Sequence, residues 1–245
     1  MAILNVTPDS FSDGGRFHSA DDVVRAAQDA VDQGADLLDI GGESTRPGAE
    51  AVSASEQIDR VAPAIEGIRA AGITCPISID TTSAEVARAA LDAGADLVND
   101  VSAGLDDGAM LPLIAERGAG VILMHRLTRP GDDSWSDCYA VDPTYPGGVV
   151  ERVRDFLLAR AQDAIDAGIE RGSIAIDPGL GFGKSVEQNF ELIRRSAEFV
   201  ATGFPVLGAV SRKSFLGAVT EIENPADRVE ASQPAHFSDR QQTHC

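Results

Sequence analysis

The chain is short of several residue types, and each shortage removes a class of protein. Its 245 residues include three cysteines, Cys75, Cys138 and Cys245, without paired or metal-ligand spacing, so we expect neither a disulfide framework nor a zinc site. No apolar run is long enough to span a bilayer and no charged-then-apolar leader occurs, which predicts a cytoplasmic protein. Aromatic residues make up 5% of the chain, so Ala, Val, Ile and Leu carry the apolar content.

Positive charge is also scarce. The 20 basic residues face 39 acidic ones, and the formal net charge is −19. Such a field repels nucleic acid and anionic membranes, so neither is an expected partner. An anionic substrate would need a local cluster of Arg, Lys or a metal ion. Only Lys184 and Lys213 are lysines, and both lie in loops marked by glycine and serine.

One unit recurs along the chain: a short apolar strand-like run, a polar or Gly-rich loop, and an Ala-rich amphipathic stretch that ends in Gly. The strand-like runs are Ile3–Val6, Leu37–Ile40, Ile77–Ile79, Leu97–Val98, Val121–Met124, Ile174–Ile176 and Val206–Val210. Helical patterns between them include Ala20–Gln33, Glu56–Ala70, Ala84–Ala93, Val149–Ala167 and Val186–Val200. This alternation predicts parallel strands with crossover helices. A doubly wound open sheet would fit too, but seven even repeats favour an α/β fold of the TIM-type (β/α)8 barrel class that lacks its eighth βα unit.

Polar residues follow the predicted strands, where a parallel barrel builds its active site. A lone Asp or Asn there is usually a helix cap or turn residue, and we expect Glu43, Asp100, Asp106 and Asp107 to be caps or to support the residues that contact the ligand. Capping does not explain the convergence of the remaining carboxylates, amides and one ammonium: Asn5, Asp80, Asn99, Asp177 and Lys213. Because an unpaired carboxylate beside apolar side chains is costly, we expect Asp80 and Asp177 to pair with a cationic or N–H-rich ligand.

The glycine-rich loops match neither a phosphate-binding P-loop nor a dinucleotide fingerprint, so no nucleotide cofactor is expected. Asn5 with a nearby Asp could offer hard oxygen ligands to Mg²⁺, which suits a phosphate substrate in an acidic protein. The longest loop runs from about His125 to Gly148, and a loop of that length is more often functional or mobile than idle.

Four stretches, in order along the chain, resemble the signatures of dihydropteroate synthases: Asn5–Gly15, Gly41–Gly48, Asp177–Lys184 and Ser211–Phe215. The similarity runs from Ala2 to about Glu230, and several long motifs in the right order are far more specific than one short pattern. The resemblance implies a transferase of folate biosynthesis. It would condense 6-hydroxymethyl-7,8-dihydropterin diphosphate with 4-aminobenzoate, giving 7,8-dihydropteroate and pyrophosphate, and sulfonamide sensitivity is an expected family property.

Carried over by motif, the resemblance also assigns roles. The pterin would be held by Asp80, Asn99, Asp177 and Lys213, with Met124 against its ring. Asn5 would help to bind Mg²⁺, and the residues near the diphosphate would be Thr45, Arg46 and Ser211. The 4-aminobenzoate pocket would be framed by Phe182, Pro47 and Ser214. The catalytic residues would be Asp80, which stabilises the cation left on the pterin when pyrophosphate departs, and Lys213.

The chain departs from the family at its end. The family's last strand carries an Arg-x-His motif that helps to bind the anion, and no such motif follows Val206–Val210 in this sequence. We therefore expect a barrel domain over residues 1–230 and a disordered, non-family tail over 231–245, as a truncation or frameshift would give. Two alternatives to an active synthase stay open: an inactive pterin-binding fragment and a pterin-binding methyltransferase domain. Members of the family resemble dimers built through their last helices, so the resemblance implies a homodimer, but the sequence itself does not give the oligomeric state.

Overall fold

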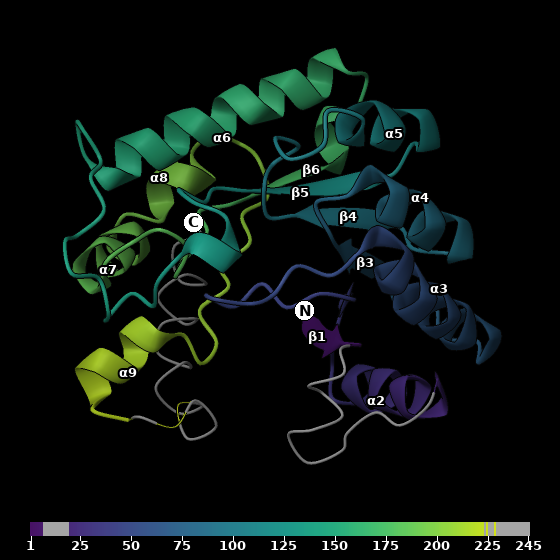
Figure 1. Cartoon of the computed structure of the whole chain (residues 1–245). Helices are drawn as coiled ribbons and strands as arrows, with labels where there is room; N and C mark the ends of the chain where they lie inside the picture. Colours follow the sequence, from purple (N-terminus) through teal and green to yellow (C-terminus); the bar gives the residue numbers. More distant parts are fainter. Residues whose placement is uncertain (7–19, 223, 225–227, 229–245) are drawn as a thin grey trace.

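A computed structural model describes residues 1–6, 20–222, 224 and 228. Within these residues, six parallel strands form one sheet, and each strand pairs with the next along the chain (Figure 1). The strands are β1 (Ala2–Asn5), β2 (Leu38–Gly41), β3 (Ile77–Asp80), β4 (Leu97–Asp100), β5 (Gly120–Met124) and β6 (Ile174–Asp177). A doubly wound sheet reverses its strand order at a switch point, whereas this uninterrupted order is that of a barrel.

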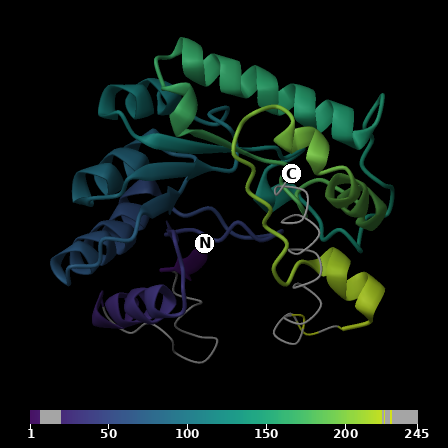
Figure 2. The ribbon, with the colours of Figure 1, turned by 180° about the vertical axis from the view of Figure 1, so that it is seen from behind.

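Helices cover the outside of the curved sheet, as the views from both sides show (Figures 1 and 2). They are α2 (Ala20–Asp32), α3 (Ala54–Ala70), α4 (Ala84–Ala93), α5 (Met110–Arg117), α6 (Val149–Asp166), α7 (Val186–Arg194), α8 (Ala197–Val200) and α9 (Ser214–Thr220), with short 3-10 turns at Pro130–Asp132 and Arg171–Ser173. The expected helices at α2, α3, α4 and α6 are confirmed within about two residues. In the described part of the chain, no helix has the length and hydropathy that crossing a bilayer requires.

Three helical features differ from expectation. The helix expected over Val186–Val200 is two helices, because Arg195 leaves the helical conformation with φ −109° and ψ 21°. The helical patterns named above did not include α5 or α9. Helix α5 begins at Met110, its N-cap residue Ala109 has no side chain that could cap it, and it contains Pro112, so its local signals are weak. Burial of its apolar face against the core, including Met110 and Ile114, holds it in place.

Alternate residues of each strand point to opposite faces of the sheet, and the two faces differ in chemistry. On the outer face, Leu38, Ile40, Ile77 and Ile79 are fully buried in the core that the helices complete. The alternate positions on the inner face mix apolar residues with polar ones, and the polar ones are Asn5, Asp39, Ser78, Asp80, Asn99 and Asp177. The polar side chains expected at the site therefore stand on the inner face of the sheet.

The seventh strand, expected over Val206–Val210, is reduced to a single bridge between Val206 and Ile176. Two backbone hydrogen bonds secure it, from Ile176 N–H to Pro205 O and from Leu207 N–H to Ile176 O, both 2.9 Å. Among the described residues no strand lies on its far side, and a strand with one short pairing gains little over an irregular segment. Residues 231–245, expected to form a tail, lie outside the described residues, so the domain boundary stays a prediction.

Candidate active site

The strand register brings four strand ends into one layer. Asn5 pairs with Gly41, Gly41 with Asp80, and Asp80 with Asn99. Gly41 keeps this layer open, because a Cβ there would lie 3.2 Å from Asn5 Oδ1 and 3.6 Å from Asp80 Cβ. The expected convergence of Asn5, Asp80 and Asn99 is thus a consequence of parallel pairing plus one missing side chain.

Asp80 carries the least satisfied oxygen of this layer. Its Oδ1 is buried and accepts no hydrogen bond from the residues that the structure describes. Burial raises the pKa of Asp80 well above its ordinary value, the carboxylates of Asp39 and Asp100 raise it further, and Lys213 opposes the rise. A buried carboxylate oxygen without a donor is costly, so its retention points to a ligand that donates an N–H to it.

Asp39, which was not among the residues expected at the site, lies on the inner face in the middle of β2. The side chain is 2% exposed. Ser78 Oγ donates to Asp39 Oδ1 over 2.6 Å, and Asn99 Nδ2 lies 3.3 Å from each carboxylate oxygen. Burial raises the pKa of Asp39, and the bonds from Ser78 and Asn99 oppose the rise. The sequence does hold a signal for Asp39. It is a charged residue within an apolar strand, and it alternates with the residues that face outward.

Asp177 ends β6 opposite Met124 of β5, and both side chains are buried. Asp177 Oδ1 accepts the Gly179 N–H over 2.7 Å, which fixes the start of the glycine-rich loop. Gly179 has φ +69°, and a Cβ there would collide with the carbonyl of His125. Only glycine therefore lets this loop lie flat against the end of β5.

Lys213 approaches the same cluster from the loop before α9. Its stem crosses Gly181, where a Cβ would lie 3.1 Å from Lys213 Cδ, and its ammonium lies 4.3 Å from the centroid of the Phe182 ring. Burial lowers the pKa of Lys213, while the carboxylates of Asp177 and Asp80 oppose that fall. The structure thus brings together Lys213, Asp177, Asp80 and Phe182, with a cation–π contact included.

Lys184, the second lysine, is fully buried and serves the loop itself. Its Nζ donates to the carbonyls of Phe182 (2.8 Å), Gly179 (2.9 Å) and His125 (3.2 Å), and it lies 3.1 Å from His125 Nδ1. Burial lowers the pKa of Lys184 to about 7. Burial, followed by the charge of Lys184, lowers the pKa of His125 to about 2, so His125 is neutral and can accept from the lysine.

Replacing each lysine by alanine should separate these two roles. Lys184→Ala leaves the carbonyls of His125 and Phe182 without a donor among the described residues and should lower the free energy of unfolding by about 3 kcal/mol. For the pterin that the resemblance implies as ligand, Lys213→Ala should cost little stability but weaken binding by roughly 30-fold, because it removes a charge-assisted contact. Urea unfolding and titration calorimetry at a temperature where both variants are folded would compare them. Equal losses of pterin affinity would contradict the division.

A cavity of about 510 Å³ opens beside this cluster, beneath the loop that follows β2. Of the residues predicted for the site, Thr45 and Asp80 line it. The loop is held by a hydrogen bond from Gly48 N–H to Pro130 O (3.1 Å) and by Glu43 Oε1, which accepts the Val52 N–H over 2.9 Å. Glu43 therefore has the structural role expected of it. Pro47 in this loop is half-buried, and Arg46 is exposed.

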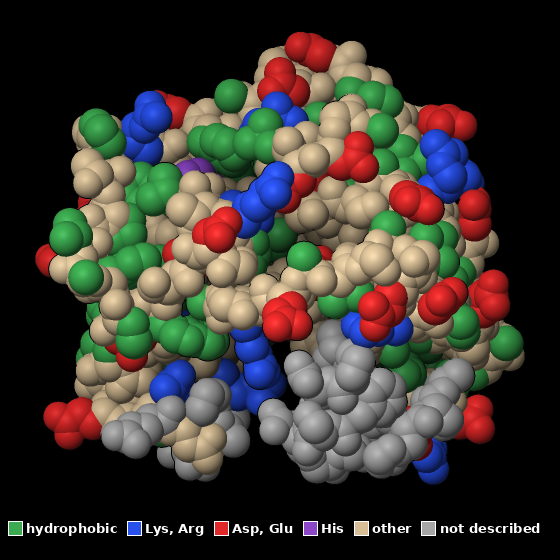
Figure 3. Space-filling model, viewed as in Figure 1, with side chains coloured by type: hydrophobic (Ala, Val, Ile, Leu, Met, Phe, Trp, Pro, Cys, Tyr) green, Lys and Arg blue, Asp and Glu red, His purple; other side chains and the backbone are tan. Residues whose placement is uncertain are grey.

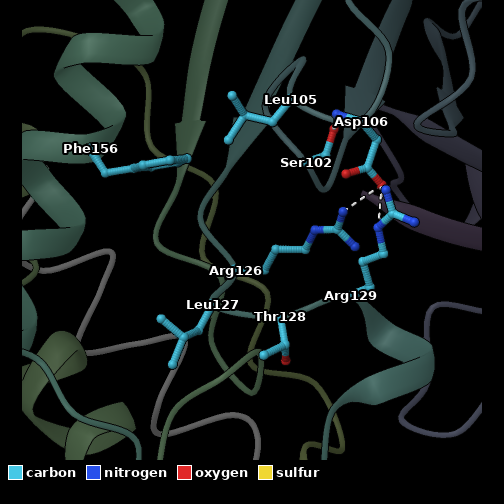
Figure 4. Close-up of a pocket in the computed structure, with 8 residues that line it drawn as sticks. All are labelled: Ser102, Leu105, Asp106, Arg126, Leu127, Thr128, Arg129 and Phe156. Carbon is cyan, nitrogen blue, oxygen red and sulfur yellow. Dashed lines mark hydrogen bonds and ion pairs between the residues drawn. The ribbon is translucent and has the colours of Figure 1, made fainter.

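Two arginines that were not expected at the site, Arg126 and Arg129, also line this cavity. The carboxylate of Asp106 lies 2.6 Å from Arg126 and 3.8 Å from Arg129. The same three side chains also line a second, smaller cavity of about 200 Å³. Both guanidinium groups point to Asp106 there (Figure 4). Figure 3 shows the hollowed centre of this face with acidic and basic side chains around it. In a chain of charge −19, these guanidinium groups are a local source of positive charge.

The long loop after β5 packs against the glycine-rich loop. Asp133 accepts the Gly183 N–H over 2.8 Å, and Tyr145 donates to the Gly183 carbonyl over 2.7 Å. Ser214 Oγ accepts the Ser136 N–H over 3.2 Å, so this hydroxyl is already engaged by the protein. Ser211 is exposed. The loop thus frames the side of the site where Phe182 stands.

Comparisons with known proteins agree with this geometry. The family model described as pterin binding enzyme matches residues 1–242. A dihydropteroate synthase of Streptococcus pyogenes is 48% identical over 89% of this chain and 77% of its own length. A probable bifunctional folylpolyglutamate synthase/dihydropteroate synthase of Haloferax volcanii is 50% identical over 95% of this chain, which spans only 26% of that longer protein.

Solved structures give the same result for the fold. The dihydropteroate synthase of Xanthomonas albilineans with 4-aminobenzoic acid has a TM-score of 0.87 and 41% identity, covering 99% of this chain and 83% of that one. The Yersinia pestis enzyme in a sulfonamide drug complex has a TM-score of 0.89 and 37% identity, covering 99% and 84%. These matches confirm the α/β fold of barrel type.

Proposed function

Because this chain belongs to the dihydropteroate synthase family of pterin-binding enzymes, we propose that it condenses 6-hydroxymethyl-7,8-dihydropterin diphosphate with 4-aminobenzoate in folate biosynthesis. The products would be 7,8-dihydropteroate and pyrophosphate. The observation that carries the proposal is the inner polar cluster, in which the buried Asp80 Oδ1 has no donor among the described residues. A pterin presents several N–H groups on a flat ring, which is the chemistry such a cluster requires.

The pterin would lie between Asp80, Asn99 and Asp177, with Met124 packing against its ring. Carboxylate and amide oxygens accept from its N–H groups, and Lys213 donates to its carbonyl or ring nitrogen. Burial of these groups strengthens each contact, since the local dielectric is low. Binding would also remove the free-energy cost of burying Asp80 Oδ1 without a hydrogen bond, because the ligand supplies the missing donor.

Bond cleavage would be assisted electrostatically rather than by a covalent nucleophile. The bond between the pterin methylene carbon and the diphosphate oxygen breaks, and both electrons leave with pyrophosphate. The pterin ring delocalises the resulting positive charge, and the nearby carboxylate of Asp80 stabilises it. The neutral amine of 4-aminobenzoate then forms the new C–N bond and releases its extra proton to water.

The two anionic groups would bind nearer the mouth. Thr45, Arg46 and Ser211 are proposed to contact the diphosphate, and Phe182, Pro47 and Ser214 to frame the 4-aminobenzoate. The solved relative from Xanthomonas albilineans contains 4-aminobenzoic acid, which supports this substrate class. Ser214 Oγ already accepts the N–H of Ser136, so this hydroxyl would contact the substrate and hold the long loop at the same time.

Asn5 is the residue proposed to hold Mg²⁺. Among the residues that the structure describes, no three His, Cys, Asp or Glu side chains form a metal-binding group. A single amide oxygen beside the open Gly41 position still fits, because Mg²⁺ keeps several waters and takes its other ligands from substrate phosphates. When bound there, the ion would neutralise charge on the diphosphate.

Removing the metal is expected to stop turnover but not pterin recognition. EDTA should abolish pyrophosphate release, and excess Mg²⁺ should restore it. Asn5→Ala should raise the Mg²⁺ concentration needed for half-maximal activity by about tenfold, equivalent to about 1.4 kcal/mol. Binding of 6-hydroxymethylpterin, which carries no phosphate, should be unchanged in both cases. An Asn5→Ala variant with the normal Mg²⁺ requirement would remove Asn5 from the metal site.

One assay tests the proposal against its alternatives. Purified protein is incubated with the pterin diphosphate, 4-aminobenzoate and Mg²⁺, and pyrophosphate is measured. Release that depends on 4-aminobenzoate supports a synthase. Tight pterin binding without release would identify an inactive pterin-binding fragment, and methyl transfer from a methylated pterin to a cobalamin protein would identify the methyltransferase. Sedimentation would test the homodimer, and the cytoplasmic location likewise stays a prediction.

A further inference from the structure

Asp39 is a buried carboxylate that the proposed chemistry does not use. It stands on the inner face of β2, one inward position below Gly41 and therefore below the layer of Asp80 and Asn99. It accepts hydrogen bonds from Ser78 Oγ at 2.6 Å and from Asn99 Nδ2 at 3.3 Å. A buried charge is rarely retained for stability alone, since well-packed apolar residues often serve as well. A role in the site is therefore the better explanation.

An ionised carboxylate accepts hydrogen bonds and donates none. The end of the Asn99 amide that faces Asp39 must therefore be its NH₂ group, and the carbonyl oxygen must turn the other way. No group in the described part of the chain donates to Asn99 Oδ1. Without Asp39, the two ends of the amide are nearly equal in size and the side chain could bind in either direction.

We propose that Asp39 is a positioning residue that fixes the direction of the Asn99 amide and thereby selects pterins with a 2-amino group. This inference rests on the proposed function. With its direction fixed, Asn99 presents an oxygen acceptor beside a second N–H donor. That pair complements an edge with an amino donor next to a ring-nitrogen acceptor, as in a 2-aminopyrimidine. It repels the edge of a 2-oxo analogue, where a carbonyl replaces the amino group.

The surroundings of Asp39 suit this role. The short bond from Ser78 ties the carboxylate to β3, and Asn99 belongs to β4, so the contact spans three adjacent strands. Burial raises the pKa of Asp39, but both donors favour its charged form and oppose the rise. The anchor is thus rigid, and it lies outside the layer that touches the ligand.

The test compares the preference for 6-hydroxymethylpterin over its 2-oxo counterpart, 6-hydroxymethyllumazine, by titration calorimetry. The wild-type chain should prefer the pterin by about 100-fold or more, because a site built to bond an amino group rejects the analogue without it. Asp39→Asn keeps the volume but can offer either oxygen or N–H to Asn99, so the preference should fall below about tenfold. Ser78→Ala is the matched control, since it removes the short bond but keeps the carboxylate, and its preference should stay close to that of the wild type.

The ratio of the two affinities separates positioning from structural damage, since a loosened fold would weaken both ligands alike. Full preference for the pterin in a folded Asp39→Asn variant would overturn the inference. Should that variant not fold, Asp39→Ser takes its place, because a hydroxyl also donates or accepts. A wild-type chain that binds neither ligand would refute the proposed function itself, whereas strong pterin binding with an unchanged ratio in the variants would refute only the role of Asp39.

Discussion

Asp177→Ala is expected to abolish pterin binding, with a loss of affinity of about 1000-fold, or about 4 kcal/mol. The carboxylate is 4% exposed, so a ligand bound to it would be shielded from water. Its removal would leave the N–H groups of a bound pterin without an acceptor and Lys213 without one of its two neighbouring carboxylates. Calorimetric titration with 6-hydroxymethylpterin measures the loss.

Asp100 provides the matched control. Like Asp177, it ends a strand, is buried, and accepts a backbone N–H two residues later, from Ser102 over 2.7 Å. Successive side chains of β4 point to opposite faces of the sheet, so Asp100 lies on the outer face and Asn99 on the inner face. Asp100→Ala should lower stability by about 2 kcal/mol and change pterin affinity less than threefold. Unchanged affinity in a folded Asp177→Ala variant would show that the pocket is assigned wrongly.

Asp80→Asn is expected to reduce turnover by about 1000-fold and, at the same time, to stabilise the fold by about 1–2 kcal/mol near neutral pH. Turnover falls because a neutral amide stabilises a pterin cation far less than a carboxylate does. Stability rises because the substitution removes a charge whose Oδ1 is buried without a described donor and which neighbouring carboxylates repel. Steady-state pyrophosphate release and urea unfolding measure the two effects.

The stabilisation should depend on pH in a defined direction. Because the pKa of Asp80 is raised in the folded state, the folded chain holds this proton more tightly than the unfolded chain does. This tighter proton binding adds to the free energy of unfolding in acid. The contribution is lost as the pH rises from the ordinary pKa of aspartate through the raised pKa of Asp80 in the folded state. The advantage of Asp80→Asn should therefore grow over that interval and shrink in acid. A variant that is less stable than the wild type at neutral pH would mean that Asp80 is well paired.

Much of the site could be predicted because its determinants are local in sequence. Parallel strands place their carboxyl ends on one edge, so polar residues after each strand must meet whatever the loops do. Asp80, Asn99, Asp177 and Lys213 could be assigned in this way, and the family motifs then supplied a ligand. Glycines at the ends of helices likewise marked where each unit ended, as Gly94 does for α4 with φ +112°.

Other features depend on contacts between distant segments. Nothing local distinguishes Lys184 from Lys213, since both follow glycine- or serine-rich stretches. Three carbonyls, one directly after β5 and two in the loop after β6, enclose Lys184, whereas the ring of Phe182 and two carboxylates surround Lys213. Similarly, Arg126 and Arg129 became part of the cavity wall only when the loops after β2 and β5 met at Gly48 and Pro130.

The sequence alone therefore determined the repeating βα unit, the parallel order and the residues at the strand ends, because hydrophobic period, glycine stops and motifs are written in neighbouring positions. Tertiary structure decided which face each strand residue occupies, and so placed Asp39 inside the barrel beside Ser78 and Asn99. It also reduced the expected strand at Val206–Val210 to a single bridge. A strand is defined by its partners, and burial by what packs from elsewhere in the chain, so neither can be settled by the residues of one segment.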